Sequence, residues 1–436
     1  MRDAVAMQRY LQRHAEASLP DCPAGSGRWS QVLVIPAYRE SIQLLDELSR
    51  LPARGARTLV ILVLNRPDWD TDAAANEPLR EALHGRRQCA GSDGDSQVLP
   101  VGATTDLYLH DMETLVGPLP KAHGVGLARK TGCDIALRWR AAGAIDSDWI
   151  CCTDADARLP SSYFEQLAGA PPTASACVFP FRHIPAGRQR IDDATALYEL
   201  RLHHYVLGLE YAGSPYAWHS LGSSLAVRAQ AYAHCRGFPR RSGAEDFYLL
   251  NKLAKLGDIA RLRGDCVQIA SRPSRRVPFG TGPAVQAIAA TGESEARHAA
   301  LFYHPDTFTA LRAVLCATAQ TASDHNTGLR EQLAEQDLAP GLLRATRDVL
   351  RALDIDNALA HCHRQRSTGA GFLRHFHQWF DGFRTLKFIH GLRDAGWPNQ
   401  PLSALQTMQP MLWPSAEPFT VEVLRAAIAR HWGWRN

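Results

Sequence analysis

Lysine is scarce in this chain of 436 residues. Of its 48 basic residues only five are lysines, and the formal net charge is +4. Proteins that bind nucleic acid usually carry a concentrated basic surface, and this excess is too small and too dispersed to predict one. Because arginine pairs with phosphate and carboxylate groups through two parallel hydrogen bonds, the composition favours a small anionic ligand and no nucleic acid.

Other features are also absent. The ten cysteines include no C-x-x-C pair and no zinc-like spacing, so we expect free thiols in a reducing cytoplasm. The opening MRDAVAMQRYLQRHAEASLP lacks the apolar core of a signal peptide, and no stretch approaches the roughly 18 apolar residues of a membrane-spanning helix. With 45% hydrophobic and 21% charged residues, the composition is that of a soluble globular protein. The sequence predicts a cytoplasmic protein without a transmembrane segment.

What the chain does contain is an alternation of strands and helices. WSQVLVIPAYRE is an apolar run typical of a buried strand, SIQLLDELSRL has helical spacing, and ARTLVILVLNRPDWD is a second strand. Further strands are expected at DWICC and ACVFPFRHI, helices over residues 191–210 and 245–256, and a strand turning into a helix at HSLGSSLAVRAQAYAHC. KAHGVGLARKTGCDIALRWRAAGAID is expected to begin with a glycine-containing turn and continue as a helix. This alternation predicts an α/β fold with a parallel sheet and crossover helices.

The chain is longer than one hydrophobic core usually supports, and its pattern changes at about residue 282. Beyond that point only helical spacing is found, as in LREQLAEQDLAPGLLRATRDVLRALDIDNALAHCHRQ. We therefore predict three parts: an N-terminal helix that packs on the body (residues 1–28), an α/β domain (29–285) and a helical C-terminal region (286–436).

Polar side chains gather where predicted strands end or the following helix begins. They form four sets: Arg39 with Glu40, residues 65–72, residues 154–158, and the pair Glu245 and Asp246. In an open α/β sheet, ligands bind at the carboxyl ends of the strands. We expect these four sets to meet at one edge of the sheet.

Two carboxylates, Asp154 and Asp156, follow the apolar run DWICC in CTDADARLP. Two like charges at this spacing repel, so they need either solvent or a shared cation. Carboxylate oxygens can supply part of the octahedral shell of a hard divalent cation, which phosphate oxygens of a substrate complete. Alone, the pattern leaves open both a solvated turn and a metal site.

Five segments resemble glycosyltransferase family 2. They occur in the order VIPAYRE, GVGLARKTG, CTDAD, GSSLAVRAQAYAHCRGFP and GAEDFYLLNKLAKLGD. The resemblance extends over about residues 31–282 and covers neither the N-terminal helix nor the helical C-terminal region. It implies the GT-A fold, a Rossmann-like nucleotide-diphospho-sugar transferase domain. It also implies transfer of a sugar from a nucleotide diphosphate donor to an acceptor hydroxyl, with inversion.

The resemblance implies roles for single residues. Asp154 and Asp156 match the family's D-x-D, which holds Mg²⁺ or Mn²⁺ against the diphosphate of the donor. Asp246, preceded by Glu245, matches the general base that faces the acceptor hydroxyl, whereas the residues alone equally allow an electrostatic role at a helix N-terminus. The segment that lines the nucleotide base and ribose corresponds to Pro36, Ala37, Tyr38 and Glu40.

The chain departs from the family pattern around the base. Where members commonly carry Asn before the first-strand Glu and one or two Asp after the second strand, this sequence has Arg39, Asn65 and Arg66. We expect Asn65 to contact the base or ribose, and Asp70 to replace the missing carboxylate through a shifted loop.

Further residues are candidates for binding the donor or the acceptor. Lys121, Arg129 and the SRPSRR arginines are expected to steady the leaving diphosphate, although solubility explains any single surface arginine. Those loop arginines are Arg272, Arg275 and Arg276. Acceptor contacts are expected in AWHSLGSS, from Trp218, His219 and Gly222, with ordinary packing as the alternative.

The sequence thus predicts a metal-dependent glycosyltransferase that transfers a sugar from a nucleotide-sugar donor to an acceptor hydroxyl. An acceptor that also carries an anionic group would suit the arginine-rich site. Three alternatives are open. They are a retaining transferase of the same fold, as in the mannosylglycerate synthases, a nucleotidyltransferase, and a non-catalytic carbohydrate-binding relative.

Overall fold

The computed structural model describes residues 2–51, 55–89, 98–271, 280–291, 299–324, 328–365, 368–408, 413–414 and 417–435. Its contacts divide the chain into two compact units. Unit 1 comprises residues 1–192, 220–286 and 433–436, and unit 2 comprises residues 193–219 and 287–432. These units differ from the predicted ranges 1–28, 29–285 and 286–436. Residues 193–219 group with the helical region, and the last four residues group with unit 1.

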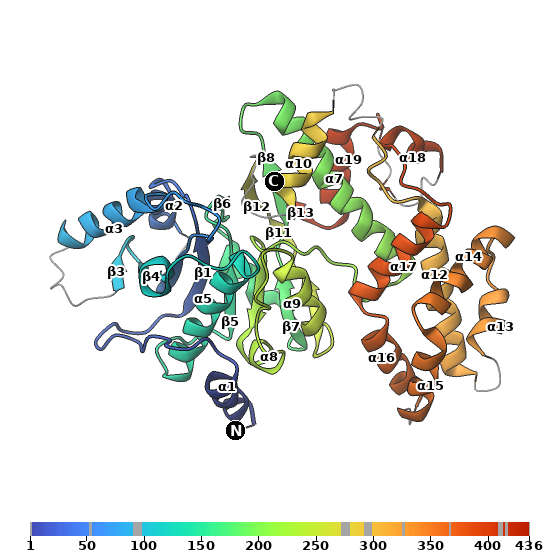
Figure 1. The fold of residues 1–436 in the computed structure, drawn as a ribbon, viewed down its shortest axis with the longest axis horizontal. Helices are drawn as coiled ribbons and strands as arrows, with labels where there is room; N and C mark the ends of the chain where they lie inside the picture. Colours follow the sequence, from blue (N-terminus) through green and yellow to red (C-terminus); the bar gives the residue numbers. More distant parts are fainter. Residues whose placement is uncertain are drawn as a thin grey trace. The chain divides into compact units, whose positions relative to one another are not determined.

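Unit 1 is built on an eight-stranded sheet with the order β10-β7-β9-β5-β1-β2-β4-β3 (Figure 1). Its strands are β1 (Gln31–Ala37), β2 (Thr58–Leu64), β3 (Val98–Pro100), β4 (Thr105–Asp111), β5 (Trp149–Cys152), β7 (Ala174–Val178), β9 (Leu225–Arg228) and β10 (Asp258–Arg261). Strands β5, β1, β2 and β4 are parallel neighbours. The predicted α/β class is confirmed.

The predicted parallel pairing holds for the central strands, and two strands of the sheet are antiparallel to their neighbours. β9 is antiparallel to β5 and β7, and β3 is antiparallel to β4. β9 runs the opposite way because the chain enters it from the carboxyl edge, where Leu225 pairs with Cys152. In addition, no element was predicted for the stretch that forms β4.

Helices cover both faces of the central strands. The helices of unit 1 are α1 (Arg2–Arg13), α2 (Leu44–Ser49), α3 (Glu77–Cys89), α4 (Met112–Val116), α5 (Gly124–Ala141), α6 (Tyr163–Gln166) with the 3-10 turn Leu167–Gly169, α8 (Ala229–His234) and α9 (Glu245–Leu253). Alternate β1 residues face opposite sides. Val34 lies against α5, whereas Leu33 and Ile35 lie on the side of α2. α1 packs on α5 and α8.

Two smaller sheets complete unit 1. One has the order β6-β12-β8, and the other pairs β11 with β13. Their strands are β6 (Ala157–Arg158), β8 (Phe181–Ile184), β11 (Gly264–Asp265), β12 (Val267–Ala270) and β13 (Trp434–Arg435). The single strand predicted at ACVFPFRHI is two strands of different sheets, β7 and β8, which Phe179 and Pro180 separate. Proline has no N–H for a ladder, which explains the interruption.

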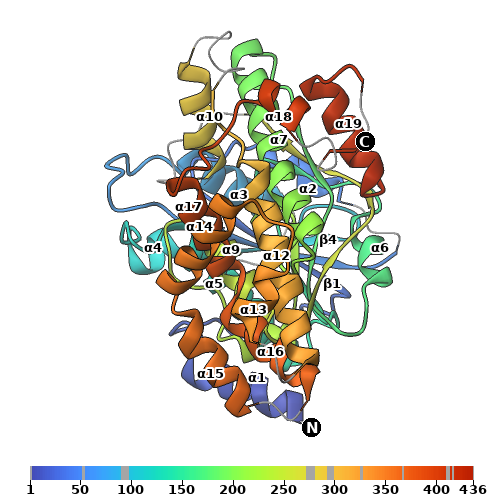
Figure 2. The ribbon, with the colours of Figure 1, turned by 90° about the vertical axis from the view of Figure 1, so that its right-hand side faces the viewer.

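In its described residues, unit 2 consists mainly of helices. α7 (Gln189–Ala212) begins in unit 1 and continues into unit 2, and α10 (Thr281–Ala290) crosses the other boundary. The remaining helices are α12 (Pro305–Ser323), α13 (Leu329–Ala334), α14 (Pro340–Ala352), α15 (Ile355–Gln365), α16 (Gly369–Trp379), α17 (Gly382–Asp394), α18 (Leu402–Met408) and α19 (Val421–His431). α12 packs against α13, α14, α16 and α17, which Figure 2 shows side by side.

The order of the central strands creates a switch point. The chain moves from β1 to β2 on one side and later returns to place β5 on the other side of β1. The connections on the two sides diverge there, and in α/β folds ligands bind at the carboxyl ends of the strands at such a point. The segments that follow β1 and β5 at this edge contain Tyr38 and Asp154.

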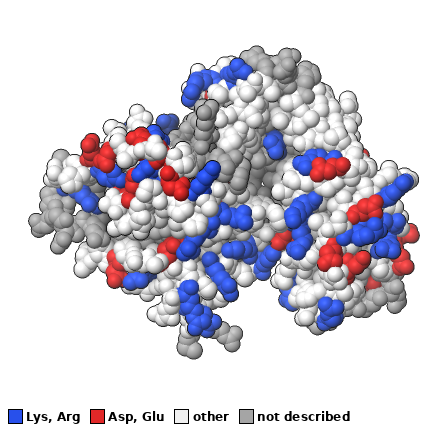
Figure 3. Space-filling model, viewed as in Figure 1, with Lys and Arg blue, Asp and Glu red and all other residues white. Residues whose placement is uncertain are grey.

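No helix in the described ranges is long and apolar enough to cross a bilayer. On the face drawn in Figure 3, basic and acidic side chains are interspersed over much of the surface. The basic residues form small groups there and no single continuous field.

Gly132 of α5 allows the helix to lie directly on β1 and β2. A Cβ atom at this position would lie 2.4 Å from Cγ1 of Val34 and 2.9 Å from Cγ2 of Val63. We predict that Gly132→Ala destabilises unit 1 by about 1–3 kcal/mol, because the overpacking exceeds the gain in helix propensity. Gly85→Ala in α3, where nothing lies within 4 Å, is the matched control and should be neutral or stabilising by up to about 1 kcal/mol. Urea unfolding measures both, and equal midpoints would contradict the prediction.

Candidate active site

Arg129, in the second turn of α5, connects three separate segments of unit 1. Its Nη2 donates to Oδ1 of Asp154 at 2.6 Å, its Nε to Oε1 of Glu245 at 3.1 Å, and its Nη1 to the carbonyl oxygen of Gly222 at 2.8 Å. The side chain is 3% exposed. A buried guanidinium is tolerated only with such partners, so these three segments are held in register at the carboxyl edge of the sheet.

Glu245 and Asp246 open α9 and differ in environment. Glu245 is 4% exposed and paired with Arg129, whereas Asp246 is partly buried, and its Oδ1 accepts from the N–H of Phe247 at 2.6 Å. Burial, and then the charge of Asp246, raise the pKa of Glu245 to about 7, although Arg129 opposes the shift. Burial also raises the pKa of Asp246. Burial thus favours the protonated form of both carboxyl groups and raises the pKa of each.

The direction of β9 brings a third segment to this edge. Because β9 starts at the carboxyl edge, the residues before it lie beside the end of β5, where Oγ1 of Thr153 donates to the carbonyl oxygen of Ser223 at 2.9 Å. Gly222 is next to Arg129, and a Cβ there would lie 2.3 Å from Nη2. The structure thus brings Gly222, Asp154, Glu245 and Arg129 together.

Asp154 and Asp156 leave the sheet after β5, and both are partly exposed. In the part of the chain that the structure describes, no group of three or more His, Cys, Asp or Glu side chains could hold a metal ion by itself. Two carboxylates two residues apart fit a divalent cation whose remaining ligands come from a bound anion. Since Asp154 also pairs with Arg129, a cation and the guanidinium would share its charge.

After β1, Tyr38, Arg39 and Asp70 form a compact cluster. Asp70, 7% exposed, accepts from the Tyr38 hydroxyl, from Nε and Nη2 of Arg39 at 2.9 Å each, and from the N–H of Asp72 at 3.1 Å. Hydrogen bonds from Arg39 above all hold the pKa of Asp70 well below its usual range. The loop after β2 thus carries Asp70 next to Tyr38 and Arg39, as expected for a shifted loop. Protein groups, however, occupy all four acceptor positions of its carboxylate.

The loop after β2 depends on residues that the sequence did not single out. Asn76, 1% exposed, accepts from the N–H of Arg39 at 3.0 Å and donates to Asn65 O and to Glu113 Oε2, each at 3.0 Å. Glu113 also pairs with Arg66. Glu113 follows β4, the strand that was not predicted, so no pattern pointed to it. Asn65 is part of this framework, because its amide nitrogen donates to the carbonyl oxygens of Ala37 and Val63.

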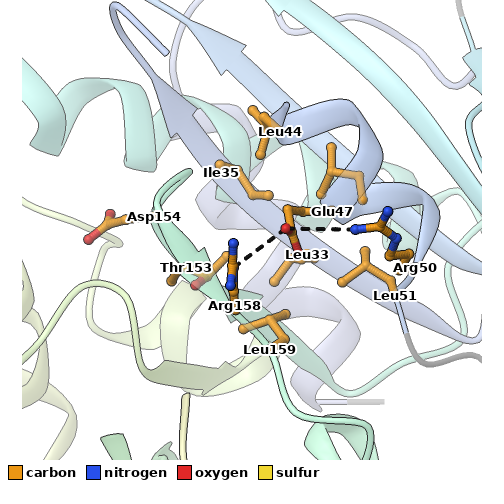
Figure 4. A pocket seen from close by; sticks show the side chains of 12 residues that line it. Leu33, Ile35, Leu44, Glu47, Arg50, Leu51, Thr153, Asp154, Arg158 and Leu159 are labelled. Carbon is orange, nitrogen blue, oxygen red and sulfur yellow. Dashed lines mark ion pairs between the residues drawn. The ribbon is translucent and has the colours of Figure 1, made fainter. Parts of the chain in front are cut away.

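A cavity of about 90 Å³ lies on the α2 side of the switch point (Figure 4). Leucine side chains and Ile35 form its apolar wall, and Asp154 lies at one end. Glu47 stands between Arg158, at 3.4 Å, and Arg50, at 3.9 Å. The cavity is thus lined both by residues of β1 and by residues of the acidic turn after β5.

The other predicted residues are distributed as follows. Pro36 and Ala37 are buried within β1, Glu40 is partly exposed three residues beyond its end, and Lys121 is exposed in the turn before α5. Arg272, Arg275 and Arg276 lie outside the described residues.

Trp218 and His219 belong to unit 2, unlike Gly222. Nε2 of His219 lies 3.0 Å from Nδ1 of His203, and both rings stand edge-on to Trp432. Trp218 and His219 are each 5% exposed, and each contacts aromatic rings: Trp218 contacts Tyr216, and His219 contacts His203 and Trp432.

Comparison with known proteins gives weak likenesses only. No family model and no curated protein matches the chain. Among solved structures, it is similar to S. aureus TarS residues 1–349 in complex with UDP-GlcNAc, with 13% identity, a TM-score of 0.38, and coverage of 81% of this chain and 91% of that one. It is also similar to the mannosyltransferase PcManGT from Pyrobaculum calidifontis in complex with GDP-Man and Mn²⁺, with 15% identity, a TM-score of 0.35, and coverage of 91% and 98%. TM-scores below 0.5 decide neither fold nor function.

We predict that Arg129→Met lowers the free energy of unfolding by about 3–5 kcal/mol, because it leaves two carboxylates at the edge without their buried cation. Arg28→Met is the matched control, since it removes an exposed pair with Asp146 and should change stability by less than about 1 kcal/mol. Urea unfolding of both variants is the measurement. An Arg129→Met variant as stable as the wild type would show that the bridge does not hold the site together.

Proposed function

We propose that the protein is a glycosyltransferase that moves a sugar from a nucleotide diphosphate donor to an acceptor hydroxyl, with inversion. The observation that carries the proposal is the bridge of Arg129 between Asp154, in the D-x-D turn, and Glu245, in the E-D pair. These are the two acidic motifs that the family resemblance assigns to donor and acceptor. A glycosyl transfer needs both within one site, because the bond to the leaving phosphate breaks as the acceptor oxygen attacks.

The donor is proposed to lie across the switch point, from Tyr38 and Arg39 to the turn after β5. Asp154 and Asp156 would hold Mg²⁺ or Mn²⁺, which supplies positive charge to the diphosphate as it leaves. Asp70 holds Tyr38 and Arg39 in place, so that the partly exposed guanidinium of Arg39 would face the nucleotide where family members commonly carry Asn. The cavity beside Asp154, which has both apolar and charged lining residues, offers further space for part of the donor.

The acceptor hydroxyl is proposed to approach Asp246. Its oxygen forms the new bond to the anomeric carbon, its proton goes to the Asp246 carboxylate, and the electron pair of the broken bond leaves with the nucleoside diphosphate. Glu245 is tied to Arg129 and nearly inaccessible, so its part is to fix the start of α9. The raised pKa of Asp246 makes this carboxylate a stronger base than an ordinary aspartate.

We predict that Asp246→Asn lowers kcat roughly 10²- to 10⁴-fold while donor affinity changes by less than about twofold, because only proton transfer is lost. The donor is first found by thermal-shift screening of UDP-, GDP-, CDP- and dTDP-sugars with and without Mn²⁺. Release of nucleoside diphosphate then gives kcat, and calorimetry gives donor affinity.

The comparison variants for this experiment flank β5. Asp154→Asn should instead abolish Mn²⁺-dependent donor binding, whereas Asp148→Asn, just before the amino end of the strand, should behave like the wild type. Near-normal turnover of Asp246→Asn would exclude it as the base. NMR of the product distinguishes inversion from retention, release of pyrophosphate would indicate a nucleotidyltransferase, and silence across the whole panel would indicate a non-catalytic relative.

We predict that Asp70→Asn weakens donor binding by roughly tenfold with little change in kcat, because it releases the charge-assisted bonds that orient Arg39 and Tyr38. Asp68→Asn, at an exposed position of the same loop, is the matched control and should leave the donor affinity unchanged. Calorimetric titration with the donor found above is the measurement. An equal affinity of the two variants would show that this cluster does not face the donor.

A further inference from the structure

The chain reaches Glu245 and Asp246 through residues 235–244, which we call the pre-α9 loop. It ends in Ala244, whose backbone is left-handed with φ 53° and ψ 21°. A residue with a Cβ rarely adopts this conformation, and it persists only where the surrounding structure enforces it. The position of the two carboxylates therefore depends on what holds this loop.

The first turn of α5 holds the loop from one side. The N–H of Gly126 donates to the carbonyl oxygen of Arg241 at 2.9 Å. A Cβ at Gly126 would lie 2.5 Å from this oxygen and 2.7 Å from Pro239 O, and one at Gly124 would lie 2.8 Å from Cα of Ser242. Both glycines thus allow the loop backbone to rest directly on the helix that carries Arg129.

The N-terminal segment, residues 2–16, holds the loop from another side. Arg240 donates through Nε and Nη2 to the two carboxylate oxygens of Glu16, each at 2.9 Å, and Glu16 is 15% exposed. This two-bond geometry is more favourable than that of most surface pairs. At the start of the loop, Gly237 lies so close to Tyr10 that a Cβ would be 2.4 Å from the tyrosine oxygen.

The same segment is anchored to α5 by buried polar groups. The hydroxyl of Tyr10 donates to Asp134 Oδ1 at 2.6 Å, and Nζ of Lys130 donates to the Tyr10 oxygen at 2.8 Å and to Asp134 Oδ2 at 2.6 Å. The N–H of Glu16 donates to Asp134 Oδ2 at 2.9 Å, which fixes the residue that holds Arg240. Lys130 directly follows Arg129, so the anchor and the charged bridge share one helix.

We propose that residues 2–16 are a positioning element for Glu245 and the proposed base Asp246, acting through the Glu16–Arg240 pair on the pre-α9 loop. The inference rests on the proposed function, because it concerns the placement of Asp246. None of these residues touches the reacting groups, and the donor-binding residues after β1 and β5 lie on other segments. Loss of the pair should therefore affect turnover and leave donor binding intact.

The test compares two substitutions in the N-terminal part of the full-length protein. Glu16→Gln weakens the pair with Arg240 and should lower kcat roughly ten- to a hundredfold, since small misplacements of reacting groups have large effects, with donor affinity unchanged within about twofold. Asp21→Asn is the matched control. It removes the pair between Asp21 and Arg138 of α5, with Nη2 to Oδ1 at 2.6 Å, which does not involve the loop, and should keep the wild-type kcat.

Two further measurements separate positioning from general stability. Arg240→Met removes the other partner of the pair, leaves Glu16 beside Lys130 (Nζ to Oε1, 3.6 Å), and should lower kcat as Glu16→Gln does. Amide hydrogen exchange over residues 236–247 should rise in both of these variants and not in Asp21→Asn. Unchanged kcat in Glu16→Gln or Arg240→Met, or an equal loss in Asp21→Asn, would overturn the proposal.

Failure of the proposed function has a different outcome: the wild type itself neither transfers nor binds any sugar nucleotide of the panel. In that case hydrogen exchange still decides whether the N-terminal segment holds the loop, and unaltered exchange in Glu16→Gln would overturn it.

Discussion

The buried guanidinium of Arg129 is the interaction on which the site depends. Four carboxylates, Asp154, Asp156, Glu245 and Asp246, leave the fold at the same edge, and like charges so close together would drive their segments apart. The positive charge of Arg129 offsets this repulsion, and its guanidinium donates one hydrogen bond to each of three segments. A lysine has no planar fork and could not hold the three partners in fixed directions.

The arginine can serve in this way because glycines bring α5 close to its neighbours. Gly132 lets the helix lie on β1 and β2, and Gly124 and Gly126 let the pre-α9 loop lie on its first turn. Arg129 sits midway between these two contacts. In the sequence, GVGLARKTG is typical of a glycine turn that opens a helix. In the structure, Gly126 and Gly132 lie within α5 and make no turn. A Cβ atom at either position would clash with a neighbouring segment.

The sequence predicted the parts whose signal is local. The apolar runs of β1, β2 and β5, the helices α5, α7 and α9, and the acidic motifs at their ends could be read from periodicity and turn residues. Strand β4 was not predicted because TDLYLHD is a short run between a loop and a turn, with polar residues at both ends. The direction of β9 also escaped, since strand orientation depends on where a long connection returns.

Long-range pairing was not predictable at all. Nothing in the sequence connects Arg39 to Asp70, Asn76 to Glu113, or Glu16 to Arg240, because each pair joins residues more than thirty positions apart. The expectation that Asp70 fills the place of a missing carboxylate is a case in point. The loop after β2 does bring Asp70 next to the segment after β1. Its carboxylate, however, already accepts hydrogen bonds from Arg39 and Tyr38, so Asp70 would act on a ligand only by orienting these two side chains.

The same reasoning separates two adjacent carboxylates that the sequence leaves equivalent. Neighbouring residues on a helix point about 100° apart, so Glu245 and Asp246 cannot both face Arg129. Glu245 does, and burial leaves it no path to an external hydroxyl. Asp246 remains partly accessible, and its bond from the N–H of Phe247 leaves acceptor capacity on the carboxylate. Accessibility and free acceptor positions, more than basicity, therefore favour Asp246 as the group that takes the proton.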